Sequence, residues 1–478
     1  MLFNSLNFAL FLPLVFVLYW FVANKNLKTQ NLLLLVSSYF FYAFWDWRFL
    51  FLLVFSTLLD YFTGLKMSQT ENQTTKKTWF WISIFVNLGF LGVFKYYNFF
   101  AASFATAISN FGLQVNPWTL KVILPVGISF YTFHGLSYVI DIYKGRIKAE
   151  KNFIDYSVFV SFFPLLVAGP IERATHLLPQ IKKKRVFNSD KAIDGIYQII
   201  WGLFKKIVIA DSCAQYANEI FANYESMNSI SLFLGAFYFS FQIYGDFSGY
   251  SDIALGTAKL FGIDLLRNFN FPYFSRDIAE FWRRWHISLS SWFRDYLYIP
   301  LGGSQGGKLT KIRNTFLIFI VSGFWHGANW TFIIWGALNA LYFLPLLLTN
   351  TNRNNIEIVA KGKQFPSLKE VFSMTSTFFL VLISWIFFRA DSITIALQYL
   401  KNLFRFNFKN GLEYLGIERY SAELVLLIIF FLCLEWISRE KEHPFFGKWI
   451  YAKLTVILLS IITLGVYSNI TDFIYFQF

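Results

Sequence analysis

Two of the five histidines in this 478-residue chain lie in segments whose composition suits acid–base chemistry. His326 lies in residues 322–330, SGFWHGANW, inside an apolar stretch. A neutral imidazole is a suitable general base near neutral pH, and neighbouring glycines let a backbone or a ligand approach it closely. Ser322 and Asn329, about one helical turn away on either side, are placed to orient the ring. The alternative is a structural histidine that hydrogen-bonds between two helices.

His286 lies in a second unusual segment, residues 276–295, in which charged and aromatic residues alternate. The segment contains four Arg, two Asp and one Glu, with aromatic residues between them. This mixture is too charged for a lipid-facing span and too apolar for a free loop. It predicts an amphipathic or re-entrant element packed into a membrane domain. A plain interfacial anchor would also explain the arginines, but it would not explain His286.

Acidic residues occur in a third segment, residues 242–252, which reads QIYGDFSGYSD within an otherwise apolar helix. Asp246, Gly249 and Asp252 recur at steps of three, which places them on one face of the helix. Carboxylates at membrane depth are costly and face a cavity or a partner charge. Two interpretations stay open: the carboxylates line a site, or they form a structural polar seam in which Asp246 pairs with an arginine.

Other common site motifs are absent from the sequence. It contains no phosphate-binding loop of the GxxxxGK[ST] type and no HExxH metal motif. The glycine-rich residues 302–307 follow no predicted strand and are typical of a turn. Cys213 and Cys433 are far apart, so neither a disulfide framework nor a thiolate metal site is predicted. We therefore expect no bound metal.

The composition predicts the elements that must hold these segments. Hydrophobic residues make up 56% of the chain, aromatic residues 22% and charged residues only 15%. The apolar residues come in long blocks, which predicts an all-α polytopic membrane protein with a single domain over residues 1–478. The net charge of +14 is explained by Lys and Arg in cytoplasmic loops. Nucleic-acid binding and disorder are disfavoured.

About eleven apolar stretches are candidate membrane spans, since a span needs roughly 20 mostly apolar residues. The first, from Leu6 to Val22, has no preceding basic residue and is interpreted as a retained span rather than a cleaved signal peptide. The stretches cover residues 5–23, 31–45, 49–65, 79–94, 122–143, 192–210, 229–262, 314–347, 373–388, 423–438 and 454–469.

The basic residues suggest an orientation with the N-terminus outside. Basic residues flank the stretch 153–180 on both sides, and Gly169-Pro170 interrupts it. We therefore predict a re-entrant element whose two ends lie on the cytoplasmic side. Gly323 and Gly327 are expected to break the stretch 314–347 in a similar way, and the topology of residues 264–372 is left open.

The three polar segments, taken together, resemble the membrane-bound O-acyltransferase (MBOAT) superfamily, particularly its bacterial alginate O-acetylation group. Relatives in this superfamily include peptidoglycan O-acetylating proteins and, more distantly, the D-alanyl transfer subunit for teichoic acids. The resemblance covers essentially the whole chain. Its motifs lie at residues 125–133, 168–171, 244–252, 281–286, 292–296, 299–303, 323–327 and 473–478.

The resemblance implies a ring of helices with re-entrant elements around a central tunnel. It also implies that His326 is the catalytic histidine and His286 the second functional histidine. Residues that we expect to line the substrate or donor site more loosely are Asp246, Asp252, Arg283, Arg284, Trp285 and Asn329.

The implied reaction moves an acyl group, preferably acetyl, from a cytoplasmic thioester to a hydroxyl group. His326 would act as the base, and His286 would orient the donor or stabilise the oxyanion. No cofactor is expected to stay bound, and acetyl-CoA or another acyl thioester would be the donor substrate. The final acceptor would be an exported or cell-wall polysaccharide.

The implied setting is a multi-pass protein of the cell's inner or cytoplasmic membrane, in contact with lipid. A periplasmic or extracellular acetyltransferase is the expected partner. Three alternatives stay open: D-alanyl or other acyl transfer to teichoic acid or peptidoglycan, a membrane transporter, and a non-catalytic scaffold. A transporter would need internal repeats, which the sequence does not display.

Overall fold

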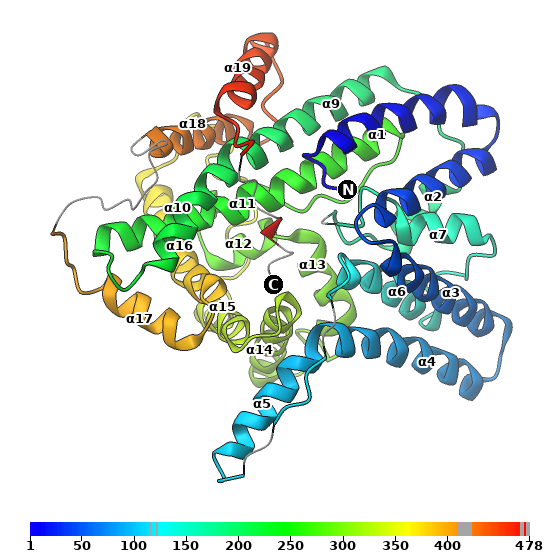
Figure 1. Cartoon of the computed structure of the whole chain (residues 1–478), viewed down its shortest axis with the longest axis horizontal. Coiled ribbons are helices and arrows are strands. Elements are labelled where there is room, and N and C mark those ends of the chain that lie inside the picture. Colours follow the sequence, from blue (N-terminus) through cyan, green and yellow to red (C-terminus); the bar gives the residue numbers. More distant parts are fainter. Residues whose placement is uncertain (114–115, 121–122, 168, 410–422, 469–472, 475–478) are drawn as a thin grey trace. The chain divides into compact units, whose positions relative to one another are not determined.

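The structure is a computed structural model that describes residues 1–113, 116–120, 123–167, 169–409, 423–468 and 473–474. Every regular element in these ranges is a helix (Figure 1), which confirms the all-α prediction. The chain divides into two compact units: residues 1–195 with 254–266, and residues 196–253 with 267–478. Two of the boundaries fall inside α9 (Ser189–Leu203) and α11 (Ser229–Leu260). The single domain expected from the sequence stays a prediction.

The first unit is built from short and medium-length helices joined by buried polar contacts. Asp60 Oδ1 on α3 accepts hydrogen bonds from Ser83 Oγ at 2.6 Å and from Asn87 Nδ2 at 2.8 Å, both on α4. Such polar contacts hold helices together where lipid removes the hydrophobic driving force. The helices that lie entirely in this unit are α1 (Leu6–Val17), α2 (Leu27–Ala43), α3 (Trp47–Gln69), α4 (Gln73–Leu91), α5 (Tyr97–Ser109), α6 (Ile128–Tyr143), α7 (Phe153–Ser161) and α8 (Ala174–Ile181).

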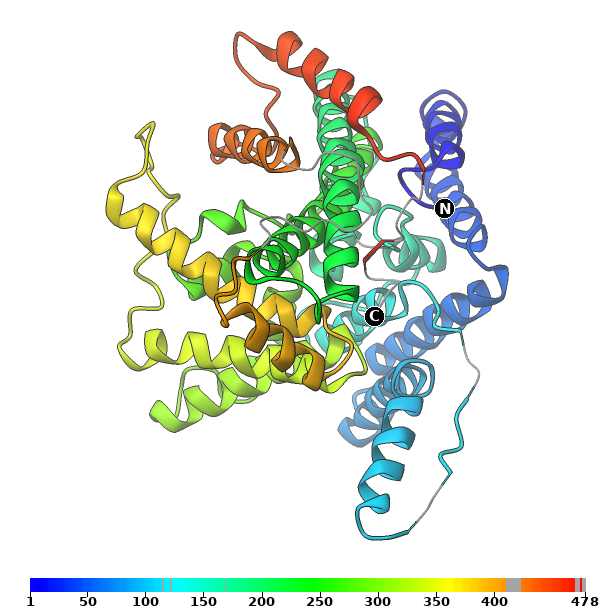
Figure 2. The same cartoon turned by 60° about the vertical axis from the view of Figure 1, so that its left-hand side comes forward.

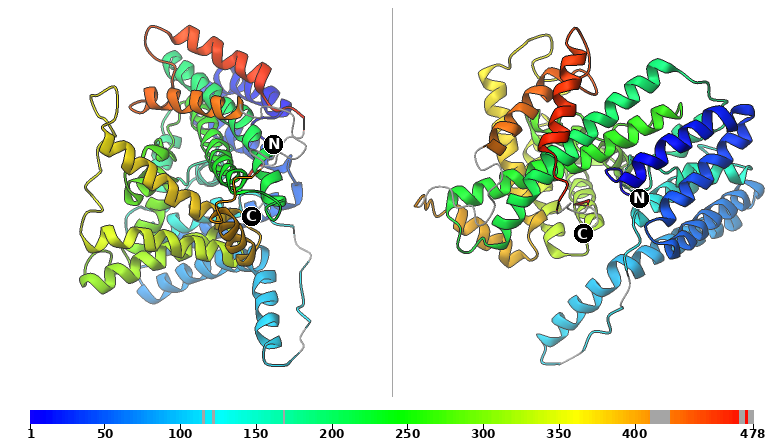
Figure 3. Two further views of the ribbon diagram at one scale, coloured as in Figure 1. Left: turned by 90° about the vertical axis from the view of Figure 1, so that its left-hand side faces the viewer. Right: turned by 45° about the horizontal axis from the view of Figure 1, so that its top comes forward.

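The second unit contains the three polar segments singled out in the sequence. Its helices include a hairpin of α14 and α15, which lie side by side (Figure 2, Figure 3). The elements that lie entirely in this unit include the π-helix η4 (Phe204–Ala210), α10 (Asp211–Ala222), α12 (Ile278–Arg284), α13 (Ile287–Phe293), α14 (Gly307–His326), α15 (Trp330–Leu348), α16 (Leu368–Arg389), α17 (Ile393–Leu403), α18 (Glu423–Ser438) and α19 (Ile450–Leu464).

Five helices among the described residues are long and apolar enough to cross a membrane, which makes this a multi-pass membrane protein. They are Leu6–Lys25, Trp47–Gln69, Gln73–Ser109, Trp330–Leu348 and Leu368–Arg389, and Ile450–Leu464 is a shorter apolar helix. The sequence predicted about eleven spans. Several of the other stretches form helices that are shorter, such as α2 with 17 residues and α6 with 16. The higher count stays a prediction.

The predicted break in the stretch 153–180 is present. Helix α7 has only nine residues, and residues 162–167 and 169–173, before α8 begins at Ala174, are not helical. Nine helical residues rise about 14 Å, roughly half the thickness of the hydrocarbon core. Phe162, Phe163 and Leu165 in the non-helical part are fully buried, which satisfies the requirement that irregular backbone be shielded from lipid. Ala168 lies outside the described residues, and the side on which each end lies stays a prediction.

Candidate active site

His326 is the last residue of α14, and the break that follows it determines its position. Gly327 is extended, with φ −161°, and Asn329 caps α15 by accepting a hydrogen bond from Thr331 N at 3.1 Å. A Cβ on Gly327 would lie 2.1 Å from the ring of Phe332. Glycine is therefore needed here because α15 returns close to the end of α14. The predicted break lies at Gly327, whereas Gly323 lies within α14.

His286 lies between α12 and α13 in a backbone conformation that is rare for a non-glycine residue. Its φ is 43° and its ψ is 55°, the left-handed region, and it forms the N-cap position of α13. This conformation costs an L-residue about 1–2 kcal/mol and is found where surrounding contacts enforce it. The side chain is fully buried. The backbone turn therefore presents the imidazole to the interior of the second unit.

The structure brings the two histidines together although forty positions separate them in the sequence. The ring centroids of His286 and His326 are 6.5 Å apart, and the ring planes are inclined by 60°. His326 is only 4% exposed. At this separation both rings can contact one bound group. In the sequence, only the family resemblance assigned a function to both histidines.

Aromatic side chains surround the two imidazoles. Phe247 on α11 packs edge-on against His286 at 4.6 Å between centroids. His326 contacts Trp325 at 4.9 Å, Trp335 at 5.2 Å and Phe388 at 5.3 Å. We call Phe247, Trp325, Trp335 and Phe388 the aromatic enclosure. It is built from α11, α14, α15 and α16, and it separates the histidines from bulk water.

Burial also determines the protonation state of His286, which lies outside the five candidate spans. Removal from water lowers the pKa of its imidazole to about 3, because burial penalises the charged form. At neutral pH the ring is therefore uncharged. An uncharged imidazole carries one N–H donor and one acceptor nitrogen, which suits hydrogen bonding or proton transfer but excludes a permanent positive charge.

The two carboxylates predicted to line a site are held in ion pairs, which are buried for Asp246 and partly buried for Asp252. Asp246 Oδ1 lies 3.0 Å from Lys206 Nζ, and Asp252 Oδ2 lies 2.5 Å from Lys205 Nζ. Lys206 also pairs with Asp211 at 2.8 Å. Both lysines lie on η4, and π-helical turns often occur at functional sites. This arrangement matches the alternative of a polar seam, with lysine where an arginine was expected. A site-lining role for Asp246 and Asp252 stays a prediction.

The two candidate arginines contact the protein itself. Arg283 donates to the carbonyl oxygens of Asn352 and Asn355, each at 2.8 Å. Arg284 donates to Glu280 Oε1 at 2.8 Å and to Asn270 O at 3.1 Å. The Arg283 bonds attach the segment after α15 to α12, and the Arg284 bonds hold α12 to the residues just before it. A role for the arginines in binding the donor stays a prediction.

The remaining candidates, Trp285 and Asn329, have structural contacts. Trp285 is 1% exposed and stacks on Phe281 at 5.5 Å. Asn329 caps α15 and donates to Asp391 O at 2.9 Å. Its predicted contact with the imidazole is not among these bonds and stays a prediction. Trp335 and Phe388 were not among the residues predicted from the sequence, because an aromatic residue in an apolar helix carries no local signal of a site.

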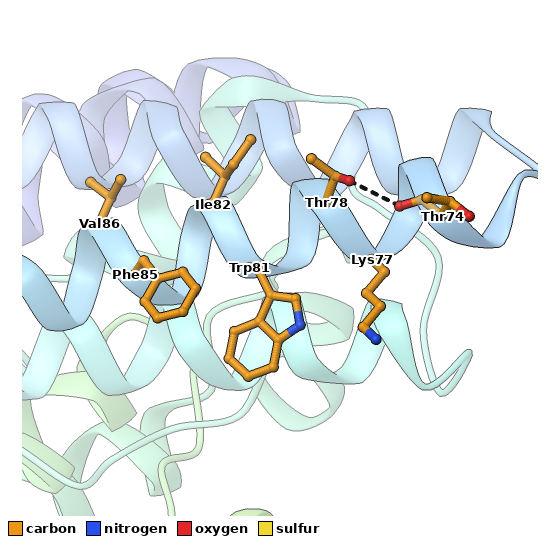
Figure 4. A pocket seen from close by; sticks show the side chains of 7 residues that line it. All are labelled: Thr74, Lys77, Thr78, Trp81, Ile82, Phe85 and Val86. Carbon is orange, nitrogen blue, oxygen red and sulfur yellow. Dashed lines mark hydrogen bonds between the residues drawn. The ribbon is translucent and has the colours of Figure 1, made fainter.

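Two further features of the described residues concern metal binding and a groove at the surface. Among the described ranges, no group of three or more His, Cys, Asp or Glu side chains is arranged to hold a metal ion. An open, mostly apolar groove runs along the exposed face of α4 (Figure 4), and such a surface suits contact with lipid. The groove is lined by Thr74, Lys77, Thr78, Trp81, Ile82, Phe85 and Val86.

Comparison with known proteins identifies the class. The sequence profile of MBOAT, the membrane-bound O-acyltransferase family, matches residues 146–388, which include both histidines. The probable alginate O-acetylase AlgI of Pseudomonas aeruginosa is 40% identical over 85% of this chain and 75% of its own length. The peptidoglycan O-acetyltransferase of Helicobacter pylori is 34% identical over 100% of this chain and 98% of its own. The chain belongs to the MBOAT family, as the sequence resemblance predicted.

A more distant relative is similar over a smaller part of the chain. The teichoic acid D-alanyltransferase of Bacillus subtilis is 31% identical over 45% of this chain and 57% of its own length. The family and the relatives together make this protein a membrane-bound O-acyltransferase.

Proposed function

We propose that this protein transfers an acetyl group from a cytoplasmic thioester, acetyl-CoA, to a hydroxyl group, for the O-acetylation of an exported or cell-wall polysaccharide. The observation that carries the proposal is the pair of buried imidazoles, whose centroids lie 6.5 Å apart within the aromatic enclosure. Two relatives that are similar over most of this chain are named O-acetylases or O-acetyltransferases, which supports acetyl as the group transferred.

In the proposed reaction, His326 accepts the proton of the acceptor hydroxyl while its oxygen attacks the thioester carbonyl carbon. A hydroxyl group is a poor nucleophile until a base removes its proton. The tetrahedral intermediate then collapses, and the C–S bond breaks. The proton passes from His326 to the departing sulfur. The products are an acetyl ester and the free thiol, and the histidine returns to its starting state.

His286 is proposed to stabilise the negative charge that develops on the carbonyl oxygen, or to orient the donor. An uncharged imidazole donates one hydrogen bond to that oxygen, and such a donor in a dry site is worth about 3–4 kcal/mol in the transition state. The aromatic enclosure has a second role. It keeps water away from the thioester, which would otherwise be hydrolysed.

D-alanyl transfer to teichoic acid is less well supported than acetyl transfer. The D-alanyltransferase is 31% identical over 45% of the chain, whereas the alginate O-acetylase is 40% identical over 85%. We therefore favour a polysaccharide as the final acceptor. Asp246, Asp252, Arg283, Arg284, Trp285 and Asn329 are proposed to line or support the site.

The proposed setting is the cytoplasmic membrane, where a ring of helices encloses a tunnel between the two surfaces. A donor that arrives from the cytoplasm must reach an acceptor outside the cell. We propose a relay in which the acetyl group passes to a hydroxyl group on a periplasmic or membrane-anchored acetyltransferase. That partner then delivers it to the polysaccharide.

The proposal is tested with membranes from cells that carry the wild-type chain or His326→Ala, supplied with labelled acetyl-CoA. We expect alkali-labile label in polysaccharide with the wild-type membranes and none with His326→Ala. Label would be sparse when the purified chain alone meets free polysaccharide, and adding the partner would restore it. Efficient acetylation by the purified chain would contradict the relay, and use of D-alanyl thioester in place of acetyl-CoA would contradict the acetyl assignment.

A further inference from the structure

The two residues that follow His286 are held by Asn268, a residue that lies outside every motif in the sequence. The carbonyl oxygen of Asn268 accepts a hydrogen bond from Ile287 N at 2.9 Å, directly after the left-handed turn at His286. The side chain of Asn268 reaches the next residue, since Ser288 Oγ donates to Asn268 Oδ1 at 2.5 Å. Backbone and side chain therefore hold two successive residues of the same turn.

Asn268 also ties this turn to a long helix. Its Nδ2 donates to Ser251 Oγ on α11 at 2.8 Å. The same helix supplies Phe247, one turn earlier, which packs against the His286 ring at 4.6 Å. Asn268 and Ser288 are each 1% exposed, and Ser251 is 2% exposed. The amide thus connects Ser288, two residues after His286, to the helix that forms one wall of the aromatic enclosure.

Asparagine is well suited to this position. Its amide offers a donor and an acceptor on one short side chain, and here the acceptor is used by α13 and the donor by α11. Aspartate would keep the acceptor but lose the donor, and alanine would lose both. Buried polar groups that keep their partners fix one geometry.

We propose that Asn268 is a positioning residue for acyl transfer: it sets the orientation of His286 by bridging α11 to the turn that carries the imidazole. The inference rests on the proposed function, because it assumes that His286 acts on the acyl group. Asn268 itself touches neither the donor nor the acceptor. Its effect is on the geometry of the reacting site.

The test measures kcat and KM for labelled acetyl-CoA in membranes where Asn268→Ala, Ser288→Ala or Ser251→Ala replaces the chromosomal copy. Misplaced catalytic groups cost about 10- to 100-fold. We expect Asn268→Ala to lower kcat by about that factor while KM for acetyl-CoA stays within about twofold. Ser288→Ala and Ser251→Ala each remove one of the two hydrogen bonds of the Asn268 amide and should lower kcat by a smaller factor.

Asn87→Ala is the matched control, since Asn87 is also buried and hydrogen-bonded between two helices, α3 and α4. It should lower the melting temperature without a comparable loss of kcat. If Asn268→Ala does not accumulate, Ser288→Ala decides the question. Wild-type kcat in Ser288→Ala would overturn the inference. So would a loss of kcat in Asn268→Ala no larger than that in Asn87→Ala when both variants lose the same melting temperature.

A failure of the inference can be told apart from a failure of the proposed function. If the wild type transfers acetyl, His326→Ala does not, and the Asn268 and Ser288 variants keep wild-type kcat, only the positioning role is wrong. If the wild type transfers no acetyl group, or His326→Ala is as active as the wild type, the proposed function is wrong.

Discussion

The carbonyl oxygen of Phe332 lies 2.2 Å from the place that a Cβ on Gly323 would occupy. Gly336 on α15 meets the carbonyl oxygen of Phe319 on α14 in the same way, at 2.3 Å. The two helices of the hairpin therefore touch through their backbones. Because His326 ends α14 only three residues after Gly323, this close approach determines where the imidazole lies relative to Trp335.

Gly323→Ala is expected to destabilise the protein and lower its activity. The added methyl group must push α15 away, and overpacking of this kind costs about 1–3 kcal/mol. Melting temperature in detergent and acetyl transfer rate are the measurements. Gly89→Ala on α4 is the matched control, because a Cβ there meets nothing within 4 Å. Equal melting temperatures and equal acetyl transfer rates in the two variants would show that the contact between α14 and α15 can accommodate an added methyl group.

His326→Ala is expected to lower the rate of acyl transfer by about 10² to 10⁴, the usual contribution of a general base. His286→Ala should reduce the rate but leave residual activity, because an orienting role is partly replaceable. The variants should be inserted and folded normally, which expression level and melting temperature will report. His443→Ala is the control, since His443 contacts Tyr197 and Phe445, which are not part of the aromatic enclosure. Wild-type transfer by a folded His326→Ala protein would remove this residue from the mechanism.

Lys206→Met is expected to be more damaging than Asp246→Asn. Lys206 neutralises both Asp211 and Asp246, so its loss leaves two buried carboxylates together. Removing a charge from a buried pair costs about 3–5 kcal/mol. In Asp246→Asn, Lys206 keeps its ion pair with Asp211. The loss in free energy of unfolding should therefore be clearly smaller. Unfolding in denaturant measures the difference.

The same pair of variants separates the two interpretations of Asp246. If Asp246 belongs to a structural seam, loss of activity in Asp246→Asn will follow its loss of stability. A stable Asp246→Asn protein that has lost acyl transfer would instead assign the carboxylate to the site.

The His176–Glu172 pair should make stability depend on pH. His176 Nδ1 lies 2.7 Å from Glu172 Oε2, and this hydrogen bond raises the pKa of the imidazole above 6.5. Asp264 also raises the pKa, whereas burial and Arg173 oppose the shift. A raised folded-state pKa stabilises the protein below the unfolded value, and the contribution disappears as pH rises through the folded value.

We therefore expect the wild type to melt at a higher temperature than His176→Gln near pH 5.5. This difference should be smaller near pH 9. Glu172→Gln removes the anionic partner and should suppress most of this pH dependence. A difference that is constant from acid to alkaline pH would show that the ion pair does not contribute.

Cysteine labelling will test the re-entrant prediction for residues 153–180. The exposed positions Lys151 and Lys183 flank the broken helix pair, and each is changed to Cys in a Cys433→Ser background. A membrane-impermeant thiol reagent should reach both positions from the cytoplasmic side only. Labelling from opposite sides would show that the segment spans the membrane.

Much of the architecture could be predicted from local sequence. Long apolar blocks predicted an all-helical membrane protein, because backbone groups in lipid must be satisfied within the helix. Gly169-Pro170 lies in the predicted break between α7 and α8, and Gly327 ends α14, whereas Gly323, also predicted to break the stretch, lies inside α14. His286 and His326, which lie in segments of unusual composition, predicted the candidate site. The motifs predicted the family.

Other features depended on which helices pack together, and local spacing does not report this. The lysine partners of Asp246 and Asp252 come from η4, about forty or more residues earlier in the chain. Trp335 and Phe388 are ordinary apolar residues until tertiary packing places them against His326. Asn268 lies in no motif, yet its amide joins α11 to the turn at His286. The sequence by itself determined which residues have the right chemistry; only the tertiary structure decided which of them meet, because contacts between distant segments arise from helix packing and burial rather than from periodicity.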